Sequence, residues 1–227
     1  VLAGVLMRVV ANTEPCVQLP AVIGGRASLN LIVGFTGRSA GGKGITETVA
    51  RLAYPSEVIE RPAGSGEGIA QLFSTAAKDE GPAVTRAIFT SPEIDKISGL
   101  MARQGSILGA EMKALAMGEL LGQQNARADT TRIVPAHSYR CCWSIGIQPG
   151  NAAPLIADVT GGGPQRIWWV PVEDRTITRA DQCADPAPLD TRLPLWRADS
   201  AGVVEITYAD PDIAEQIIET HILRQRG

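Results

Sequence analysis

Residues 28–48, SLNLIVGFTGRSAGGKGITET, constrain the fold more than any other part of the chain. A short apolar run at 29–33 predicts a buried strand, and 45–52 has the composition of a helix. Between them lie five glycines around a single lysine, Lys43. A strand, a glycine-rich turn with a lysine and then a helix form the local structure that a phosphate-binding loop requires. The segment therefore predicts a site for a phosphorylated ligand within an α/β fold.

The turn itself, 37–43, matches the pattern G-x-x-x-x-G-K. Glycine lets backbone N–H groups turn toward phosphate oxygens, and the N-terminus of the following helix favours an anion. We expect Lys43 to bind the β- and γ-phosphates as a point charge. The predicted nucleotide contacts are Gly37, Gly41, Gly42, Lys43, Gly44 and Ile45.

One position departs from this pattern. Gly44 stands where a serine or threonine normally follows the lysine and holds Mg²⁺. Thr46, two residues later, is the hydroxyl that we consider as its substitute. The departure leaves a simpler interpretation open, in which the segment is a glycine-rich turn that binds no ligand.

The composition limits the classes of function. The chain has 227 residues, which suffice for one large α/β domain, and its net charge of −3 provides no overall basic surface for nucleic acid. Aromatic residues make up 4% of the chain, which argues against a base-stacking platform. The four cysteines lack C-x-x-C spacing and are accompanied by two histidines, so we do not expect a zinc site.

The cysteines and the first residues also bear on location. Cys141 and Cys142 are neighbours in a predicted strand, so they should point to opposite faces as small core residues. Such cysteines favour a reducing, cytoplasmic setting. The apolar run at 1–10 is interrupted by Arg8 and is too short to span a membrane, and no membrane partner is expected. The chain begins with Val1, so we expect it to be a fragment.

Apolar patterns along the chain alternate between strands and helices, which predicts a mostly parallel, twisted sheet flanked by helices. We expect a helical lead-in at 1–20, a core at 21–172, and a proline-rich segment at 173–227 that continues the same domain. Residues 132–135 are expected to pair with the strand that follows them. The predicted strands are 29–33, 58–60, 87–90, 132–135, 139–148 and 167–172, and the predicted helices are 1–12, 45–52, 69–78, 93–103, 106–121 and a last one that begins at Asp210 and Pro211.

Acidic residues follow two of the predicted strands. Glu67 lies 24 residues after Lys43 in a glycine-flanked segment, where a carboxylate can polarise the water that attacks a γ-phosphate. Glu93 and Asp95 follow the strand at 87–90, where an acid can hold Mg²⁺. The simpler interpretations are a solvated loop glutamate and an acid-rich helix N-terminus.

Two further polar residues lie at strand ends. Gln148 closes the strand at 139–148 and is placed to sense the γ-phosphate, or it is a turn residue before Pro149. Arg166 precedes the strand at 167–172 and is placed to reach the nucleotide of a neighbouring subunit, or it is a surface arginine in a hairpin.

With these motifs in this order, the chain resembles the RecA-like P-loop ATPase core of ring-forming replicative helicases. More narrowly, it is similar to the helicase-like ATPases of phages and mobile elements, which often accompany primase-polymerase modules. The resemblance covers residues 21–172. It rests on the segments SLNLIVGFTGRSAGGKG, GSGEG, IFTSPEID, YRCCWSIGIQPG and GGPQRIWWVP.

The resemblance implies ATP and Mg²⁺ as cofactors and hydrolysis of ATP as the activity. It implies a phosphate-binding role for Lys43 and the role of catalytic base for Glu67. Glu93 or Asp95 would bind the metal, and Gln148 would sense the γ-phosphate. Arg166 would be the arginine finger that acts on the nucleotide of a neighbouring subunit.

The resemblance also implies partners. The chain would form a homo-oligomeric ring, a hexamer, that moves on or loads onto single-stranded DNA and works with a primase-polymerase module. Loops at 122–136 and 153–163 would face the DNA channel. A helical DNA-binding region would continue beyond the last residue.

Two other functions remain open. A small-molecule kinase would use the same loop but needs a lid with clustered arginines, for which the sequence offers only Arg175 and Arg179. A nucleotide-dependent switch or scaffold without catalysis is favoured by Gly44, because it lacks the hydroxyl that holds the metal.

Overall fold

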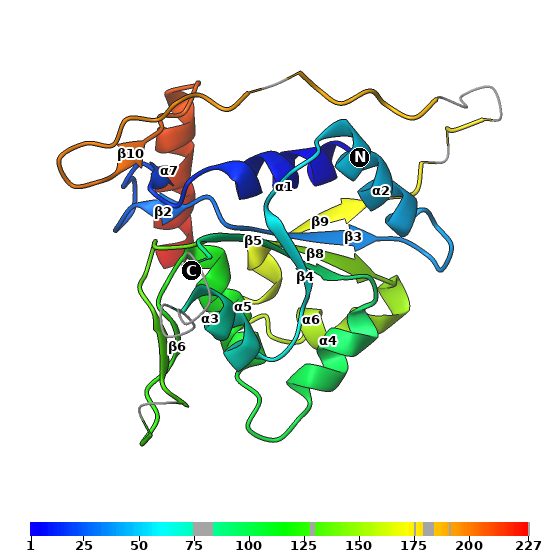
Figure 1. Cartoon of the computed structure of the whole chain (residues 1–227), viewed down its shortest axis with the longest axis horizontal. Helices are drawn as coiled ribbons and strands as arrows, with labels where there is room; N and C mark the ends of the chain where they lie inside the picture. The colour runs from blue at the N-terminus through cyan, green and yellow to red at the C-terminus, as the bar shows by residue number, and fades with distance from the viewer. Residues whose placement is uncertain (75–83, 128–129, 175, 179–183, 191, 227) are drawn as a thin grey trace.

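The computed structural model describes residues 1–74, 84–127, 130–174, 176–178, 184–190 and 192–226. Its centre is a five-stranded sheet in which all neighbouring strands are parallel (Figure 1). The prediction of an α/β fold with a mostly parallel sheet flanked by helices is confirmed. The strands, in spatial order, are β4 (Ile59–Pro62), β5 (Arg86–Ser91), β8 (Arg140–Ile147), β3 (Leu31–Thr36) and β9 (Ile167–Pro171).

The interior strands β8 and β3 are covered on both faces, which explains why their residues are largely apolar. All eight residues of β8 are buried, and four consecutive residues of β3 are buried as well. Cys141 belongs to the core on one face and Cys142 to the core on the other, which confirms their predicted opposite orientation. Two apolar segments of the sequence thus form the interior of the sheet.

Helices cover each face of the sheet (Figure 1). On one face lie α1 (Leu2–Asn12) and α2 (Lys43–Ala53), and the core there includes Met7 of α1 and Phe35 of β3. The other face carries the larger core, which is built around Trp143 of β8. The helices over that face are α3 (Gly66–Phe73), α4 (Ile94–Met101), α5 (Leu108–Met117) and the short α6 (Ala153–Ile156).

The connections that leave β3 and β8 run over opposite faces of the sheet. From β3 the chain passes through α2, on the α1 side, to the far edge strand β4. From β8 it passes through α6, on the other side, to β9. In open parallel sheets such a switch point leaves a crevice at the carboxyl ends of the two strands, where ligands bind. Gly37 and Gln148 directly follow the two strands, so they lie at this switch point.

One predicted strand pairing is wrong. Residues 132–135 were expected to pair with the following strand, but β7 (Arg132–Val134) forms an antiparallel pair with β6 (Leu121–Gln123). The predicted helix at 106–121 is correspondingly shorter. It ends because Gly118 adopts a φ of 72°, a left-handed C-cap, and this frees the chain to begin β6.

The ends of the chain meet in a small second sheet. There, β1 (Val17–Leu19) pairs with β2 (Ala27–Ser28) and, in parallel, with β10 (Val204–Glu205). The described part of 173–200 forms no regular element, as expected from its proline-rich composition. The last helix, α7 (Asp212–Gln225), begins where Asp210 and Pro211 predicted, since the Asp210 carboxylate accepts the N–H of Asp212 at 3.0 Å.

The other element boundaries differ by a few residues from those expected. The strand predicted at 29–33 begins at Leu31 and continues to Thr36, and the helix after the glycine turn begins at Lys43 rather than at residue 45. Residues 75–78 of the predicted third helix, and Arg175 and Arg179 of the kinase hypothesis, lie outside the described residues. Among the helices of the described ranges, none combines the length and the apolar composition that a membrane crossing needs.

Candidate functional site

The glycine turn at 37–42 joins the central strand β3 to α2 at the switch point of the sheet. Its first residue is fixed to the neighbouring strand, because the Gly37 N–H donates to the carbonyl of Ile147 at 3.0 Å. The turn tightens where the Gly41 N–H donates to the carbonyl of Arg38 at 3.0 Å. It ends at Gly42, whose φ of 95° is accessible to glycine at little cost. The strand, turn and helix expected around Lys43 are therefore present.

The N-terminus of α2 offers several N–H groups to a ligand. The N-cap Gly42 has no side chain to cap the helix, and the first intrahelical bond is from the Thr46 N–H to the Gly42 carbonyl at 2.8 Å. The N–H groups of Lys43, Gly44 and Ile45 therefore have no partner within the helix. Together with the helix dipole they favour a bound anion.

Lys43 lies over the turn. Its Nζ donates to the carbonyl of Gly37 at 3.1 Å and to that of Arg38 at 2.8 Å. The ammonium group is thus held at the mouth of the loop by two neutral acceptors. A phosphate would provide a charged acceptor at the same place, and charge-assisted hydrogen bonds are the stronger ones.

Thr46 does not take the position of the missing hydroxyl. Successive helical residues are rotated by about 100°, so Thr46 points about 200° away from Gly44. It is 9% exposed, whereas Ile45 is 71% exposed and Gly44 is exposed. The structure thus buries Thr46 in the fold rather than at the opening of the loop.

Glu93 and Gln148 come together at the carboxyl edge of the sheet. Gln148 follows β8, and its Nε2 donates to Oε2 of Glu93, the N-cap residue of α4, at 3.0 Å. A second contact runs in parallel, from Nδ2 of Asn151 to Oδ1 of Asp95 at 3.0 Å. Because β8 lies between β5 and β3, these polar groups line up beside the glycine turn.

Glu67 is farther away. The glycine-flanked segment expected to be a loop is the first turn of α3, which Ser65 caps by accepting the Gly68 N–H at 3.2 Å. The helix follows β4, which lies three strand spacings from β3, or about 14 Å. The structure does not bring Glu67 into contact with the turn. Its charge instead adds to burial in raising the pKa of Glu111, which the N–H of Gly122 partly offsets.

Arg166 lies at the other end of the strands from the glycine turn. It ends a short 3₁₀ helix, Pro164–Arg166, directly before β9, and β9 runs parallel to β3. The glycine turn follows the end of β3, so the two features are separated by the length of a strand. The Arg166 Nη1 donates to the carbonyl of Gly162 at 2.7 Å, while Nε is buried and has no hydrogen-bond partner.

Sequence reasoning missed two carboxylates, one beside the turn and one on α2. Glu173 follows β9, and its Oε1 accepts the backbone N–H of Arg38 at 2.9 Å. Glu47, one helical turn after Lys43, accepts a hydrogen bond from the hydroxyl of Ser144 on β8. Glu173 had a signal, since it is the first acid after the predicted strand at 167–172. Glu47 had none, because a glutamate within a helix is ordinarily solvated.

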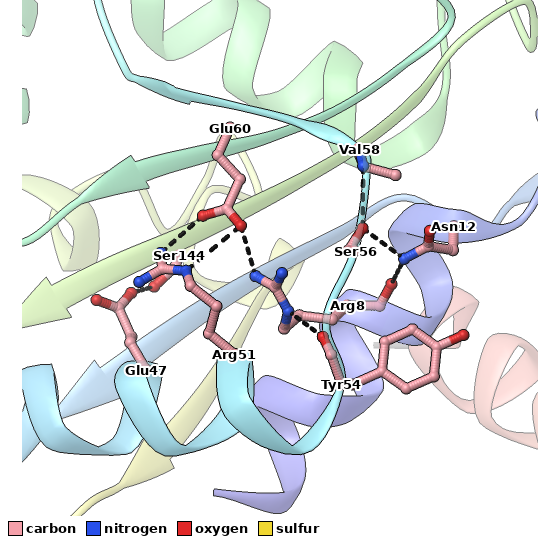
Figure 2. Close-up of polar contacts among 9 residues, drawn as sticks. All are labelled: Arg8, Asn12, Glu47, Arg51, Tyr54, Ser56, Val58, Glu60 and Ser144. Atoms are coloured by element: carbon pink, nitrogen blue, oxygen red, sulfur yellow. Dashed lines mark hydrogen bonds and ion pairs between the residues drawn. The ribbon is translucent and has the colours of Figure 1, made fainter. Parts of the chain in front are cut away.

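A network of charges fixes α2 to the rest of the fold (Figure 2). Nη1 of Arg8, on α1, lies 2.7 Å from Oε1 of Glu60 on β4, and Nη2 of Arg51, on α2, lies 2.6 Å from Oε2 of the same carboxylate. Arg8 also donates from Nε to the carbonyl of Tyr54 at 2.7 Å. Burial by itself would raise the pKa of Glu60, but the hydrogen bonds from Arg51 and Arg8 outweigh it, and the pKa is lowered.

Because known proteins offer no match, a function has to be assigned from the chemistry of the site. No protein-family model and no curated protein matches the chain.

Within the described ranges, no three His, Cys, Asp or Glu side chains gather in a way that would hold a metal ion. Magnesium in nucleotide sites is commonly bound by one or two carboxylates plus the phosphates of the substrate. The pair of Glu93 and Asp95 at the carboxyl edge fits that donor set.

Proposed function

We propose that this chain binds ATP through residues 37–45 and hydrolyses it. The observation that carries the proposal is the position of the glycine turn. It joins a central parallel strand to a helix whose first N–H groups are uncapped, at the switch point of the sheet. Gly37, Gly41 and Gly42 shape the turn, Lys43 supplies the charge, and the N–H groups of Gly44 and Ile45 complete the cradle.

The acidic edge beside the turn supports hydrolysis. With nucleotide bound, Mg²⁺ would neutralise the developing charge on the phosphates, and Glu93, with Asp95 as the second carboxylate, would hold it. Gln148 donates to Glu93 and orients that carboxylate. Gly44 contributes no hydroxyl and Thr46 is turned away, so the two carboxylates would provide the protein's ligands to the metal.

The roles of Glu67 and Arg166 rest on the resemblance to RecA-like cores. Glu67 would act as the base that orients the attacking water, after a change that brings α3 nearer to the turn. Arg166 would act on the nucleotide of a neighbouring copy, since it lies at the far edge of its own sheet.

The resemblance extends the proposal to a DNA motor. The five-stranded all-parallel sheet is compatible with a RecA-like fold. We propose a cytoplasmic helicase-like ATPase that assembles as a hexameric ring on single-stranded DNA, beside a primase-polymerase module of a phage or mobile element. The likeness in the order of the motifs supports this part, and the geometry of the turn supports ATP binding.

Turnover of ATP with and without single-stranded DNA tests the proposal. We expect hydrolysis that DNA stimulates and that Lys43→Ala abolishes, because the variant loses the phosphate contact. Lys113→Ala is the matched control, since Lys113 pairs with Asp158 at 3.0 Å on the opposite edge of the sheet. Loss of turnover in both variants, or in neither, would contradict the assignment.

A nucleotide-dependent switch is the second candidate. Gly44 favours it, because the chain lacks the hydroxyl that normally holds the metal. This function predicts tight ATP binding that Lys43→Ala abolishes, without turnover in the presence or absence of DNA. Phosphate transfer to a small acceptor would instead favour the kinase.

A further inference from the structure

The end of β9 places a carboxylate against the phosphate loop. The pairing of β9 with β3 reaches Pro171 and Thr36, and beyond it the N–H of Val172 donates to the carbonyl of Thr36 at 2.9 Å. The next residue, Glu173, therefore emerges beside the start of the glycine turn. Its position is set by the sheet register rather than by a free loop.

Glu173 contacts the loop through both backbone and side chain. Its Oε1 accepts the backbone N–H of Arg38 at 2.9 Å and lies 3.9 Å from Nε of the same residue. A Cβ added at Gly41 would lie 3.5 Å from this oxygen, so the carboxylate lies over the turn between Arg38 and Gly41. The side chain of Glu173 is 37% exposed, so it lies close to the surface.

The loop meanwhile holds its lysine in place. Lys43 donates to the carbonyls of Gly37 and Arg38, the same residues that Glu173 approaches. Through the Arg38 N–H the carboxylate is bound to the same segment, 37–45, that we propose for the phosphates. Its negative charge also repels an incoming phosphate, because like charges a few ångströms apart disfavour one another.

We propose that Glu173 is an internal competitor for the phosphate loop. It holds the loop in a closed state and lowers its affinity for nucleotide until the carboxylate moves away. The inference rests on the proposed function, because it concerns regulation of the same site.

The opposite role makes a different prediction. If Glu173 only braces the loop in the shape that phosphate requires, removing it should weaken nucleotide binding. If it competes, removing it should strengthen binding. The direction of the change in affinity therefore separates the two roles.

Binding of a fluorescent ATP analogue to the purified chain, with displacement by pyrophosphate, tests the proposal. The variants are Glu173→Gln and Glu173→Ala, with Lys43→Ala as the loss of the site. Glu205→Gln is the matched control, since Glu205 pairs with Arg26 at 3.1 Å in the small sheet away from the loop. Circular dichroism and thermal unfolding establish that each variant is folded.

We expect both Glu173 variants to bind the analogue and pyrophosphate about tenfold more tightly than the wild-type chain, as loss of one charged competitor of about 1.4 kcal/mol would give. Glu205→Gln should match the wild type. Equal or weaker binding by folded Glu173 variants, with wild-type binding still dependent on Lys43, would overturn the competitor role of Glu173 and leave the proposed ATP site intact. Absence of binding in the wild type and in both Glu173 variants would overturn the proposed function itself.

Discussion

The backbone of Pro92 passes so close to Gly146 that a Cβ at position 146 would collide with the Pro92 carbonyl. This close passage lets the chain cross the end of β8 on its way from β5 to α4, and it delivers Glu93 to Gln148. A glycine in the middle of a strand often marks such an approach of another backbone. The contact between Glu93 and Gln148 therefore depends on the absence of a side chain at Gly146.

Replacing this glycine should damage both the fold and the site. We expect Gly146→Ala to lower the free energy of unfolding by about 1–3 kcal/mol, because the Pro92 carbonyl has to move. Urea unfolding measures this loss. Gly150→Ala is the control, since nothing lies within 4 Å of a Cβ there. Equal stabilities of the two variants would contradict the close approach.

Glu111 predicts a pH dependence of stability. Burial raises its pKa, the Gly122 N–H partly offsets this, and the charge of Glu67 adds to the rise. The folded state then binds more protons than the unfolded state, so stability falls as pH rises above the ordinary glutamate pKa of about 4.3. Glu111→Gln keeps an oxygen acceptor for Gly122 and should flatten this part of the profile. Urea unfolding at several pH values from about 4 to 7 checks it, and an unchanged slope would contradict it.

At the scale of elements, Arg8 is the residue that ties α1 to both α2 and β4 (Figure 2). Its side chain is 4% exposed, whereas that of Arg51, which shares Glu60, is 49% exposed. Removing Arg8 takes away a buried guanidinium that binds both Glu60 and the Tyr54 carbonyl, whereas exposed ion pairs contribute little. The two arginines should therefore differ in their effect on stability.

We expect Arg8→Ala to lower the free energy of unfolding by about 3 kcal/mol and Arg51→Ala by about 1 kcal/mol or less. Chemical denaturation of both variants measures the difference. Because Arg51 is the matched control for loss of a positive charge near Glu60, a larger loss at Arg51 than at Arg8 would contradict the assigned role of burial.

The elements that the sequence predicted well are those set by local patterns. The strand at β3, the glycine turn and α2 follow from apolar runs and glycines that are adjacent in the chain. The pairing of β6 with β7 was missed because it depends on the left-handed turn at Gly118, which composition alone did not reveal.

Within the site, local patterns predicted which residues matter, but contacts between neighbouring strands could not be predicted. Gln148 and Glu93 were predicted from strand ends, but their mutual hydrogen bond requires β8 to lie beside β5. The contact of Glu173 with Arg38 was missed because it requires β9 to lie beside β3. Thr46 was considered as a substitute for the missing hydroxyl. Its burial depends on which face α2 turns toward the sheet, and the sequence alone did not show this.

On the scale of the whole molecule, the sheet is assembled from distant segments. The central strand β3 pairs with β8 on one side and β9 on the other, both contributed by residues beyond 139. Non-local parallel pairing slows folding, because loop closure is paid before the contacts form. We expect refolding from urea to be slow, in the range of milliseconds to seconds, and a stopped-flow measurement checks this. A microsecond phase that restores the full native signal would contradict it.

The late arrival of these partners also has a consequence during synthesis. A ribosome that adds about 5–20 residues per second needs roughly 5–20 s to go from the end of β3 to the start of β8. Throughout that interval the strand before the glycine turn has two unpaired edges and apolar side chains on both faces. Such edges invite pairing with other chains. We therefore expect the nascent chain to be exposed to wrong strand pairing until residue 171, the end of β9, has been made.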